Sequence, residues 1–274
     1  MMLADQGFLD VGDMRLEYRM IGPRPDAAPT IVLLHEGLGS VASWAGFAEA
    51  LSTATGVGVF AYSRAGYGRS SPSKLPRPIS FMHDEACQVL PRVVDAAGVR
   101  RGLLVGHSDG ASIATIYSGS IQDHRVRGLV LIAPHFISED MGIAEIARAK
   151  AAFERGPLRA KLARVHANPE NAFYGWCGPW LDPEFRNWDI RDALAHIRVP
   201  ILIVQGENDQ YGTVRQIEVA HEECYCPVEV ALLPQTRHAP HREAAEATLR
   251  AITDFANHLL RDHHEGDLAA HAAE

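Results

Sequence analysis

The sequence predicts an α/β protein with a mostly parallel sheet of about eight strands and helices on both faces. Six short and nearly continuous apolar runs recur along the 274 residues. Segments of helix length separate these runs, and several runs end at glycine-containing loops. Strands that are buried on both faces have uninterrupted apolar sequence, whereas half-exposed strands alternate between apolar and polar residues.

The six apolar runs are rich in β-branched and aliphatic residues and are bounded by turn residues, as strands are. They span residues 30–35, 56–63, 102–107, 126–134, 200–206 and 228–234. Two earlier segments, residues 7–12 and 14–22, alternate more regularly. We therefore expect them to form an antiparallel hairpin at one edge of the sheet.

Two of the intervening segments show a clear helical pattern. Residues 81–98 have apolar residues at helical spacing and end at a glycine, but Pro91 predicts a kink or a break. Residues 241–262 predict a long amphipathic helix that closes the domain. The following residues, 263–274, contain few large apolar side chains, so we expect a mobile tail.

Residues 135–190 interrupt the alternation because they contain no strand-like run. A helical stretch is followed by irregular sequence that is rich in glycine, proline and tryptophan. We expect a lid over an active site, with Trp176 and Trp180 binding substrate, although a local packing cluster is the alternative. The chain then divides into a core of residues 1–134 and 191–262, the lid, and the tail.

The composition is that of a soluble globular protein, with 47% hydrophobic and 22% charged residues. The net charge of −8 and the absence of a Lys/Arg block argue against nucleic-acid binding. No stretch approaches about 18 continuous apolar residues, so no membrane span is expected. The first residues lack the pattern of a secretory signal, and we expect a cytoplasmic location.

Neither a metal nor a cofactor is expected. The four cysteines, Cys87, Cys177, Cys224 and Cys226, fit no common zinc pattern and are expected to be reduced thiols. The sequence also contains no H-E-x-x-H motif, no P-loop, and no G-x-G-x-x-G at the end of a predicted strand.

The motif GHSDG at residues 106–110 fits the pattern G-x-S-x-G between a predicted strand and a predicted helix. A serine hydroxyl is a weak nucleophile, so it needs a base and an acid that orients the base. Asp209 and His238 follow in the expected order, each just beyond an apolar run. Parallel sheets bind ligands beyond the carboxyl ends of their strands, so Ser108, Asp209 and His238 are expected to meet there.

Alternatives exist for each of these three residues. Glu207 and Asp189 compete with Asp209 for the role of the acid, and His241 competes with His238 for that of the base. A structural serine in a turn is the alternative to a catalytic Ser108.

With these residues, the chain from about Phe8 to Leu260 resembles the α/β-hydrolase superfamily. The loop SRAGYGRS, which begins at Ser63, is similar to a Gly-x-Gly-x-Ser loop of that family. The resemblance implies that Ser108 is the nucleophile, His238 the base and His241 a supporting residue. It also implies an oxyanion hole formed by the main-chain N–H groups of Gly37 and Asp109.

Two acidic residues beside the expected oxyanion hole need an explanation. Asp109 lies in the first turn of a helix, where an anion is favoured by about 0.3–1 kcal/mol, and we expect its charge to be turned away from the hole. Glu36 stands where the family usually has glycine, and the family often has aspartate near Ser63. We expect Glu36 to supply this missing carboxylate and to pair with Arg64. The alternative is that Glu36 or Asp109 contacts a polar or cationic part of the substrate.

The resemblance implies a serine hydrolase that cleaves a small carboxylic ester, lactone or thioester through an acyl-enzyme. Two alternatives are a hydrolase of a carbon–carbon bond next to a ketone and a non-catalytic receptor on the same fold. Serine at position 108 disfavours an enzyme with an aspartate nucleophile. The superfamily hosts many reactions, so the sequence does not identify the substrate or the oligomeric state.

Overall fold

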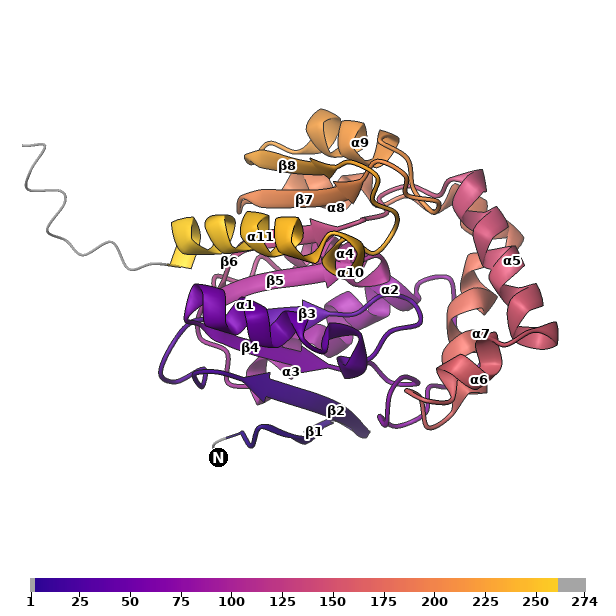
Figure 1. Cartoon of the computed structure of the whole chain (residues 1–274), viewed down its shortest axis with the longest axis horizontal. Helices are drawn as coiled ribbons and strands as arrows, with labels where there is room; N and C mark the ends of the chain where they lie inside the picture. Colours follow the sequence, from indigo (N-terminus) through magenta and orange to yellow (C-terminus); the bar gives the residue numbers. More distant parts are fainter. Residues whose placement is uncertain (1–2, 261–274) are drawn as a thin grey trace, which may run out of the picture.

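The computed structural model describes residues 3–260, in which eight strands form one sheet in the order β1-β2-β4-β3-β5-β6-β7-β8 (Figure 1). The strands are β1 (Gln6–Val11), β2 (Met14–Ile21), β3 (Thr30–Leu34), β4 (Gly58–Tyr62), β5 (Gly102–His107), β6 (Val126–Ile132), β7 (Ile201–Gly206) and β8 (Val228–Leu233). Each of the six apolar runs contains one of the strands from β3 to β8. The predicted fold class is confirmed. The expected mobile tail, residues 263–274, lies outside the described residues.

The strands β3 to β8 pair in parallel, whereas β2 is antiparallel to both β1 and β4. Every residue of β3, β4, β5 and β7 is buried, as uninterrupted apolar sequence requires. The hairpin of β1 and β2 lies at one edge of the sheet, as predicted, and the half-exposed β8 lies at the other.

Helices cover both faces of the sheet and form a separate core with each face. One face is covered by η1 (Val41–Trp44), α1 (Phe47–Thr55) and α11 (Ala245–Leu260). The other is covered by α2 (Phe81–Asp84), the π-helical segment η2 (Glu85–Val89), α3 (Leu90–Ala96), α4 (Asp109–Ser120), α8 (Arg191–His196) and α9 (Arg215–Glu223).

The two helices that the sequence predicts depart from regular α-helix in different ways. The first stays helical from Phe81 to Ala96, and its π-helical turn lies directly before α3, which contains Pro91. The prediction of one continuous helix over residues 241–262 is wrong. A short α10 (Pro240–Glu243) ends at Ala244, whose φ of −133° and ψ of 51° are not helical, and α11 begins at the next residue.

The segment between β6 and α8 contains α5 (Asp140–Arg155), α6 (Leu158–Leu162), α7 (Pro169–Trp180) and the 3-10 helix η3 (Pro183–Asn187). The helices α5, α6 and α7 lie together beside one end of the sheet (Figure 1). The expectation that Trp176 and Trp180 stand on irregular sequence is wrong, because both belong to α7. Their spacing of four residues places them on the same side of that helix.

The helix α7 forms despite its glycines and Pro179 because its first turn is well capped. The side chain of Asn168 accepts a hydrogen bond from the N–H of Asn171 at 2.9 Å, and Pro169 stands at the first helical position. Most of the helix is then buried, with Tyr174 and Gly178 as its exposed residues. Burial therefore outweighs the weak helix propensity of the sequence.

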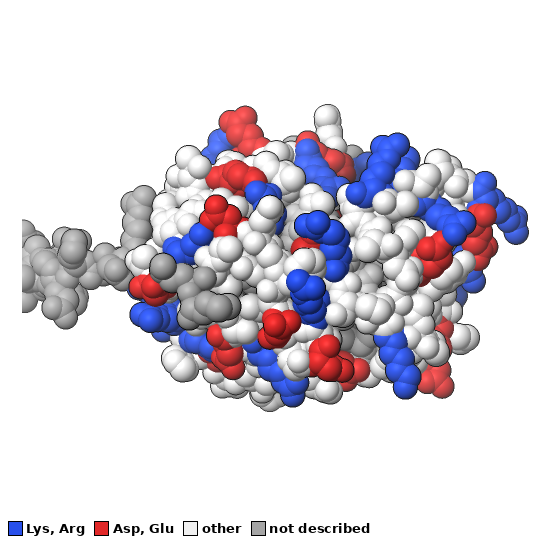
Figure 2. All heavy atoms as spheres, turned by 90° about the horizontal axis from the view of Figure 1, so that it is seen from below, with Lys and Arg blue, Asp and Glu red and all other residues white. Residues whose placement is uncertain are grey.

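Positive and negative side chains are interspersed over the surface of the molecule that Figure 2 displays. That face has no extended area of one sign, so it offers no continuous basic surface for a polyanion.

The turn between β5 and α4 needs glycine at two positions. A Cβ atom on Gly106 would lie 2.3 Å from the carbonyl oxygen of Gly110. A Cβ atom on Gly110 would lie 2.1 Å from the carbonyl oxygen of Leu34 and 2.8 Å from that of His35. Because these neighbours are backbone atoms, they have little freedom to move away. The start of α4 therefore approaches β3 closely only because both positions lack a side chain.

We expect Gly110→Ala to destabilise the protein by about 3 kcal/mol or more, because a new side chain would collide with backbone. The matched control is Gly178→Ala, at an exposed position of α7 where no atom lies within 4 Å of the added Cβ. This control should be neutral or stabilise by up to about 1 kcal/mol, because alanine favours helix. Urea unfolding measures both changes, and equal stabilities would contradict the close approach.

Candidate active site

Ser108 occupies the sharp turn between β5 and α4. Its φ of 53° and ψ of −118° lie in a region that residues other than glycine rarely adopt. The turn is fixed by two backbone hydrogen bonds, from the N–H of Ser108 to the carbonyl of Ile132 at 2.9 Å and from the N–H of Ala111 to the carbonyl of Ser108 at 2.8 Å. The surrounding backbone thus holds a strained residue in one conformation.

Ser108, His238 and Asp209 form one hydrogen-bonded line. His238 Nε2 lies 3.0 Å from Ser108 Oγ, and His238 Nδ1 lies 2.9 Å from both carboxylate oxygens of Asp209. A carboxylate accepts hydrogen bonds, so Nδ1 carries the proton and the lone pair of Nε2 faces the serine hydroxyl. The structure brings together all three residues that the sequence predicts.

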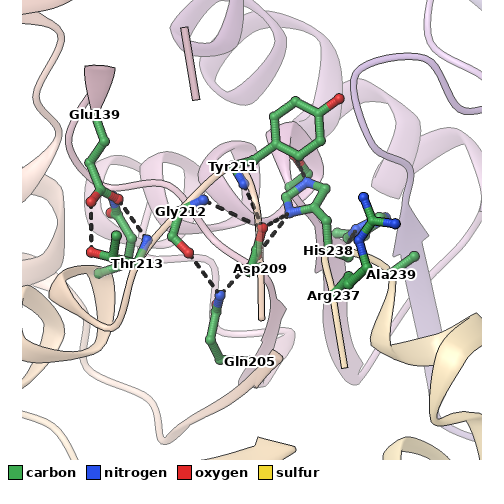
Figure 3. A network of polar contacts seen from close by, with 12 residues as sticks. Glu139, Gln205, Asp209, Tyr211, Gly212, Thr213, Arg237, His238 and Ala239 are labelled. Carbon is green, nitrogen blue, oxygen red and sulfur yellow. Dashed lines mark hydrogen bonds and ion pairs between the residues drawn. The ribbon is translucent and has the colours of Figure 1, made fainter. Parts of the chain in front are cut away.

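The carboxylate of Asp209 is held by several donors (Figure 3). The side chain of Gln205 donates to it at 2.8 Å, and so does the N–H of Tyr211, also at 2.8 Å. Burial raises the pKa of Asp209, but the contacts with His238, together with the N–H of Tyr211 and nearby His135, hold this pKa below its ordinary value. Sequence reasoning missed Gln205, although a polar residue at the end of an apolar run is a signal.

The two alternative candidates for the orienting acid, Glu207 and Asp189, are not bound to His238 in the described part of the chain. Glu207 is exposed, and Asp189 pairs with Arg191 at 2.6 Å. Within residues 3–260, neither has a hydrogen bond or ion pair with His238.

The loop that carries Asp209 is tied to the start of α5. Glu139, the residue before α5, accepts hydrogen bonds from the hydroxyl of Thr213 at 2.6 Å and from its N–H at 3.0 Å (Figure 3). The segment between β6 and α8 is therefore anchored beside the line of Ser108, His238 and Asp209.

His35 and Arg64 fix the carbonyl group of Glu36. The N–H of Arg64 donates to His35 Nε2 at 3.0 Å, so the proton of this imidazole is on Nδ1, which donates to the Glu36 carbonyl at 2.7 Å. Arg64 Nη2 donates to the same carbonyl at 3.1 Å. Burial lowers the pKa of His35 well below its ordinary value, so this imidazole stays neutral.

The position of this carbonyl determines the direction of the next N–H group. The Glu36–Gly37 peptide is trans, and the C=O and N–H of a trans peptide point in opposite directions. With the carbonyl held by His35 and Arg64, the N–H of Gly37 points away from them. Gly37 itself lines the cavity beside Ser108. Sequence reasoning missed this role of His35.

Gly37 is also in close contact with α7. A Cβ atom at this position would lie 2.1 Å from Nε1 of Trp176. The indole therefore packs directly on the loop, and the packing requires glycine there.

The predicted ion pair between Glu36 and Arg64 is wrong. Arg64 binds the backbone carbonyl of Glu36, whereas the carboxylate accepts a hydrogen bond from Ser43 Oγ at 3.0 Å. The carboxylate also lies 3.6 Å from His107 Nδ1 and 3.9 Å from Arg242 Nη2. Burial raises the pKa of Glu36, but His107, His35 and Arg242 together hold this pKa well below its ordinary value.

His107 joins Glu36 to the backbone of His238. Its Nε2 lies 2.7 Å from the carbonyl oxygen of His238, and a carbonyl accepts hydrogen bonds, so His107 donates there. Its other nitrogen, Nδ1, faces the carboxylate of Glu36. His107 thus lies between the carboxylate of Glu36 and the backbone of His238.

His241 packs beneath His107 and forms ring contacts with it, with Trp44 and with Phe47 at centroid distances of 4.7, 4.9 and 5.8 Å. Neither ring nitrogen has a hydrogen-bond partner among the described residues. Burial lowers the pKa of His241 to about 2. His241 is therefore placed as a neutral packing residue.

Asp109 is buried, with 1% of its surface exposed. Its Oδ1 accepts a hydrogen bond from Nε1 of Trp180 at 3.1 Å, and its Oδ2 has no partner among the described residues. Burial raises the pKa of Asp109, and the positive charge of Arg64 is the largest opposing influence. We expected a carboxylate turned away from the site, but the structure places it against α7 at the wall of the same cavity as Ser108.

A cavity of about 140 Å³ lies beside Ser108. Its volume favours a small substrate group, and aromatic and apolar side chains form most of its wall. The lining residues are Glu36, Gly37, Leu38, Ser108, Asp109, His135, Gly142, Ile146, Trp176, Trp180, Tyr211 and His238.

Within residues 3–260, no group of three or more His, Cys, Asp or Glu side chains is arranged to hold a metal ion. Across the same residues, no helix combines the length and apolar character needed to cross a membrane. The four cysteines are free thiols.

Residues 29–192 match a family model described as alpha/beta hydrolase fold. A putative carbamate hydrolase, RutD of Azorhizobium caulinodans, is 27% identical over 236 residues, which cover 72% of this chain and 78% of that protein. The human (lyso)-N-acylphosphatidylethanolamine lipase is 30% identical over 114 residues, 42% of this chain and 32% of that protein. Matches to the first curated relatives cover 15% to 44% of the relatives' own length.

Solved structures are similar over nearly the whole chain. The enol-lactonase from Burkholderia xenovorans LB400 is 22% identical with a TM-score of 0.71, covering 91% of this chain and 99% of that one. The esterase RhEst1 from Rhodococcus sp. ECU1013 is 19% identical with a TM-score of 0.71, covering 93% of this chain and 100% of that one. At these identities the likeness shows a shared fold.

We expect stability to fall with acidification more steeply in the wild type than in His241→Phe. Between the ordinary histidine pKa of 6.5 and the folded value of about 2, the unfolded chain binds more protons at residue 241 than the folded chain. Stability therefore decreases as pH falls, by about 1.4 kcal/mol per pH unit for one such histidine. Urea unfolding should show a smaller slope in His241→Phe, by about half of this amount near pH 6.5, where the unfolded histidine is half protonated, and by nearly all of it near about pH 5. Parallel slopes would contradict this prediction.

A second prediction concerns the partners of Glu36. Glu36→Gln and His107→Asn should be non-additive in the free energy of unfolding, with a coupling of about 0.5–3 kcal/mol, because they remove two sides of one contact. The control cycle combines Glu36→Gln with Arg64→Met. It should be additive within about 0.5 kcal/mol, because Arg64 binds the backbone of residue 36, which the substitution keeps. If the Glu36–His107 cycle were additive and the Glu36–Arg64 cycle coupled, the result would support an ion pair between Glu36 and Arg64.

Proposed function

This chain belongs to the alpha/beta hydrolase fold family, and from that premise we propose that it is a serine hydrolase that cleaves a carboxylic ester, lactone or thioester through an acyl-enzyme. The observation that carries the proposal is the hydrogen-bonded line of Ser108, His238 and Asp209, with distances of 3.0 and 2.9 Å. Nucleophile, base and orienting acid are each within hydrogen-bond reach of the next.

In the proposed first step, Ser108 Oγ attacks the carbonyl carbon while His238 Nε2 accepts the hydroxyl proton. The tetrahedral intermediate collapses, the bond to the leaving oxygen or sulfur breaks, and the leaving group takes that proton from His238. A water molecule then attacks the acyl-enzyme with His238 as base. Breaking the bond to Ser108 releases the carboxylic acid and returns the proton to the serine. Asp209 holds the imidazole in the required tautomer throughout.

The oxyanion of the intermediate would be held by the N–H groups of Gly37 and Asp109. The Gly37 N–H is directed by the fixed Glu36 carbonyl on the same peptide. Asp109 is the first residue of α4, so its N–H has no acceptor within the helix and lies at the positive end of the helix dipole. Two preorganised donors of this kind are what acyl transfer requires.

The cavity supports a small substrate whose acyl group contacts Trp176 and Trp180, and the segment of residues 135–190 would act as the lid. Both indoles line the cavity, and both belong to α7. Among the proteins that the chain resembles are a putative carbamate hydrolase, an enol-lactonase and an esterase. The activities that these proteins are named for support hydrolysis of an ester-like bond.

Ser108→Ala should lower kcat by about 10⁴-fold or more on p-nitrophenyl esters of graded chain length, and His238→Ala should be comparably severe, because members of a triad act as a unit. A fluorophosphonate should label the wild type at Ser108, which peptide mapping identifies. Ser80→Ala, at an exposed helix start, is the control and should retain full activity. Labelling at another residue, or an active Ser108→Ala, would overturn the acyl-enzyme mechanism.

The assignment of the acid is tested separately. Asp209→Asn should lower kcat by about 10²–10⁴-fold, because the base loses the charge that stabilises its protonated form. Glu207→Gln, two residues away and exposed, should have no effect. Equal losses in the two variants would contradict the assignment.

A further inference from the structure

The carboxylate of Asp109 is incompletely satisfied. The residue is 1% exposed and follows Ser108 directly. Oδ1 accepts the hydrogen bond from Trp180, whereas Oδ2 has no donor among the described residues. A buried carboxylate oxygen without a donor costs free energy, so its retention beside a nucleophile points to a ligand that supplies the donor.

The cavity beside Asp109 offers no positive charge to this oxygen. Among its lining residues are Glu36 and Asp109, but no lysine or arginine. His135, another lining residue, stays neutral because burial lowers its pKa to about 3. The lining residues themselves therefore contribute two acidic side chains and no lysine or arginine.

Arg64 offsets the charge of Asp109 only at a distance. Its guanidinium is buried, and its Nη2 binds the Glu36 carbonyl. In the part of the chain that the structure describes, no hydrogen bond or ion pair joins it to Asp109. A carboxylate so close to a developing oxyanion opposes the charge that forms there, and the opposition is strong in a site of low dielectric constant. A cation in the cavity would remove this conflict.

The other acidic residue of the cavity wall already has its partners. The carboxylate of Glu36 accepts from Ser43 through Oε1, and its Oε2, which has no hydrogen-bond partner among the described residues, lies 3.6 Å from His107 Nδ1. Arg242 Nη2 lies 3.9 Å from Oε1. Glu36 therefore has a guanidinium and a ring nitrogen within 4 Å, whereas no ion pair reaches Asp109 among the described residues, so Asp109 is the acid that we assign to a ligand.

We propose that Asp109 binds a protonated amine on the acyl part of the substrate, so that the substrates are small esters or related acyl compounds with an ammonium group near the scissile carbonyl. This inference rests on the proposed serine hydrolase function and specifies its substrate class. The ammonium would donate a charge-assisted hydrogen bond to Oδ2 and bring positive charge toward the oxyanion. Trp176, Trp180 and Tyr211, which line the same cavity, add aromatic faces that attract a cation.

The test compares two esters of equal size, the phenyl esters of glycine and of propionic acid. On the carbon next to the ester carbonyl, the glycine ester carries an ammonium group and the propionic ester carries a methyl group. Because the amino ester is intrinsically more reactive, each kcat/KM is divided by the rate constant for hydroxide-catalysed hydrolysis. The wild type should prefer the glycyl ester by about tenfold or more, as expected for one charged hydrogen bond.

In Asp109→Asn, this corrected preference should fall by about 10- to 100-fold, because the amide keeps the size and the main-chain N–H but loses the charge. The readout is the ratio of the two substrates, which a general loss of activity does not change. Glu207→Gln is the matched control and should keep both the activity and the ratio. An unchanged ratio in Asp109→Asn, or no preference in the wild type, would overturn the proposal.

A second measurement covers the case in which Asp109→Asn does not fold. Protonated n-propylamine should inhibit wild-type hydrolysis of the propionyl ester competitively, with a Ki about tenfold lower than that of n-butanol, since only the amine forms a charged hydrogen bond. Equal Ki values would overturn the amine site while the serine mechanism stands, provided that fluorophosphonate labels Ser108. Failure of that labelling together with no hydrolysis of either ester would overturn both proposals.

Discussion

The close approach of α4 to β3 is the constraint on which the site depends. Gly110 lies so near the carbonyls of Leu34 and His35 that any side chain would collide with backbone. The residue after His35 is Glu36, whose carbonyl directs the N–H of Gly37, and the residue before Gly110 is Asp109. One backbone contact therefore positions both candidate oxyanion donors relative to each other, and the strained conformation of Ser108 follows from the same turn.

Burial keeps three of the histidines around this contact neutral. His35, His135 and His241 have pKa values lowered by burial, so they are neutral hydrogen-bonding or packing groups. At His238, the carboxylate of Asp209 lies against Nδ1. A base that accepts a proton during a reaction needs a nearby negative charge, and the site places one beside His238.

The sequence predicted the line of Ser108, His238 and Asp209 because its residues follow strands, and the carboxyl ends of parallel strands meet at one edge of the sheet. The neighbours of the Glu36 carboxylate were not predictable. Arg64 does contact Glu36, but it binds the backbone carbonyl. The direction of the carboxylate toward His107 depends on the three-dimensional structure. The helical position of Trp176 was missed because glycine and proline in the sequence masked a well-capped, buried helix. Residue propensity and spacing predict helices and strands. Contacts between loops that are distant in sequence depend on tertiary packing, which these local patterns do not contain.

The segment between β6 and α8 does more than cover the cavity. In α7, Trp180 donates to the carboxylate of Asp109, and Trp176 packs on Gly37, so the two indoles contact the two residues whose N–H groups would bind the oxyanion. A shift of α7 would therefore change the geometry of both donors together. The start of α5 is tied to the loop of Asp209 through Glu139 and Thr213, which limits such a shift. The cavity wall that this segment contributes and the geometry of the two candidate oxyanion donors are thus mechanically linked.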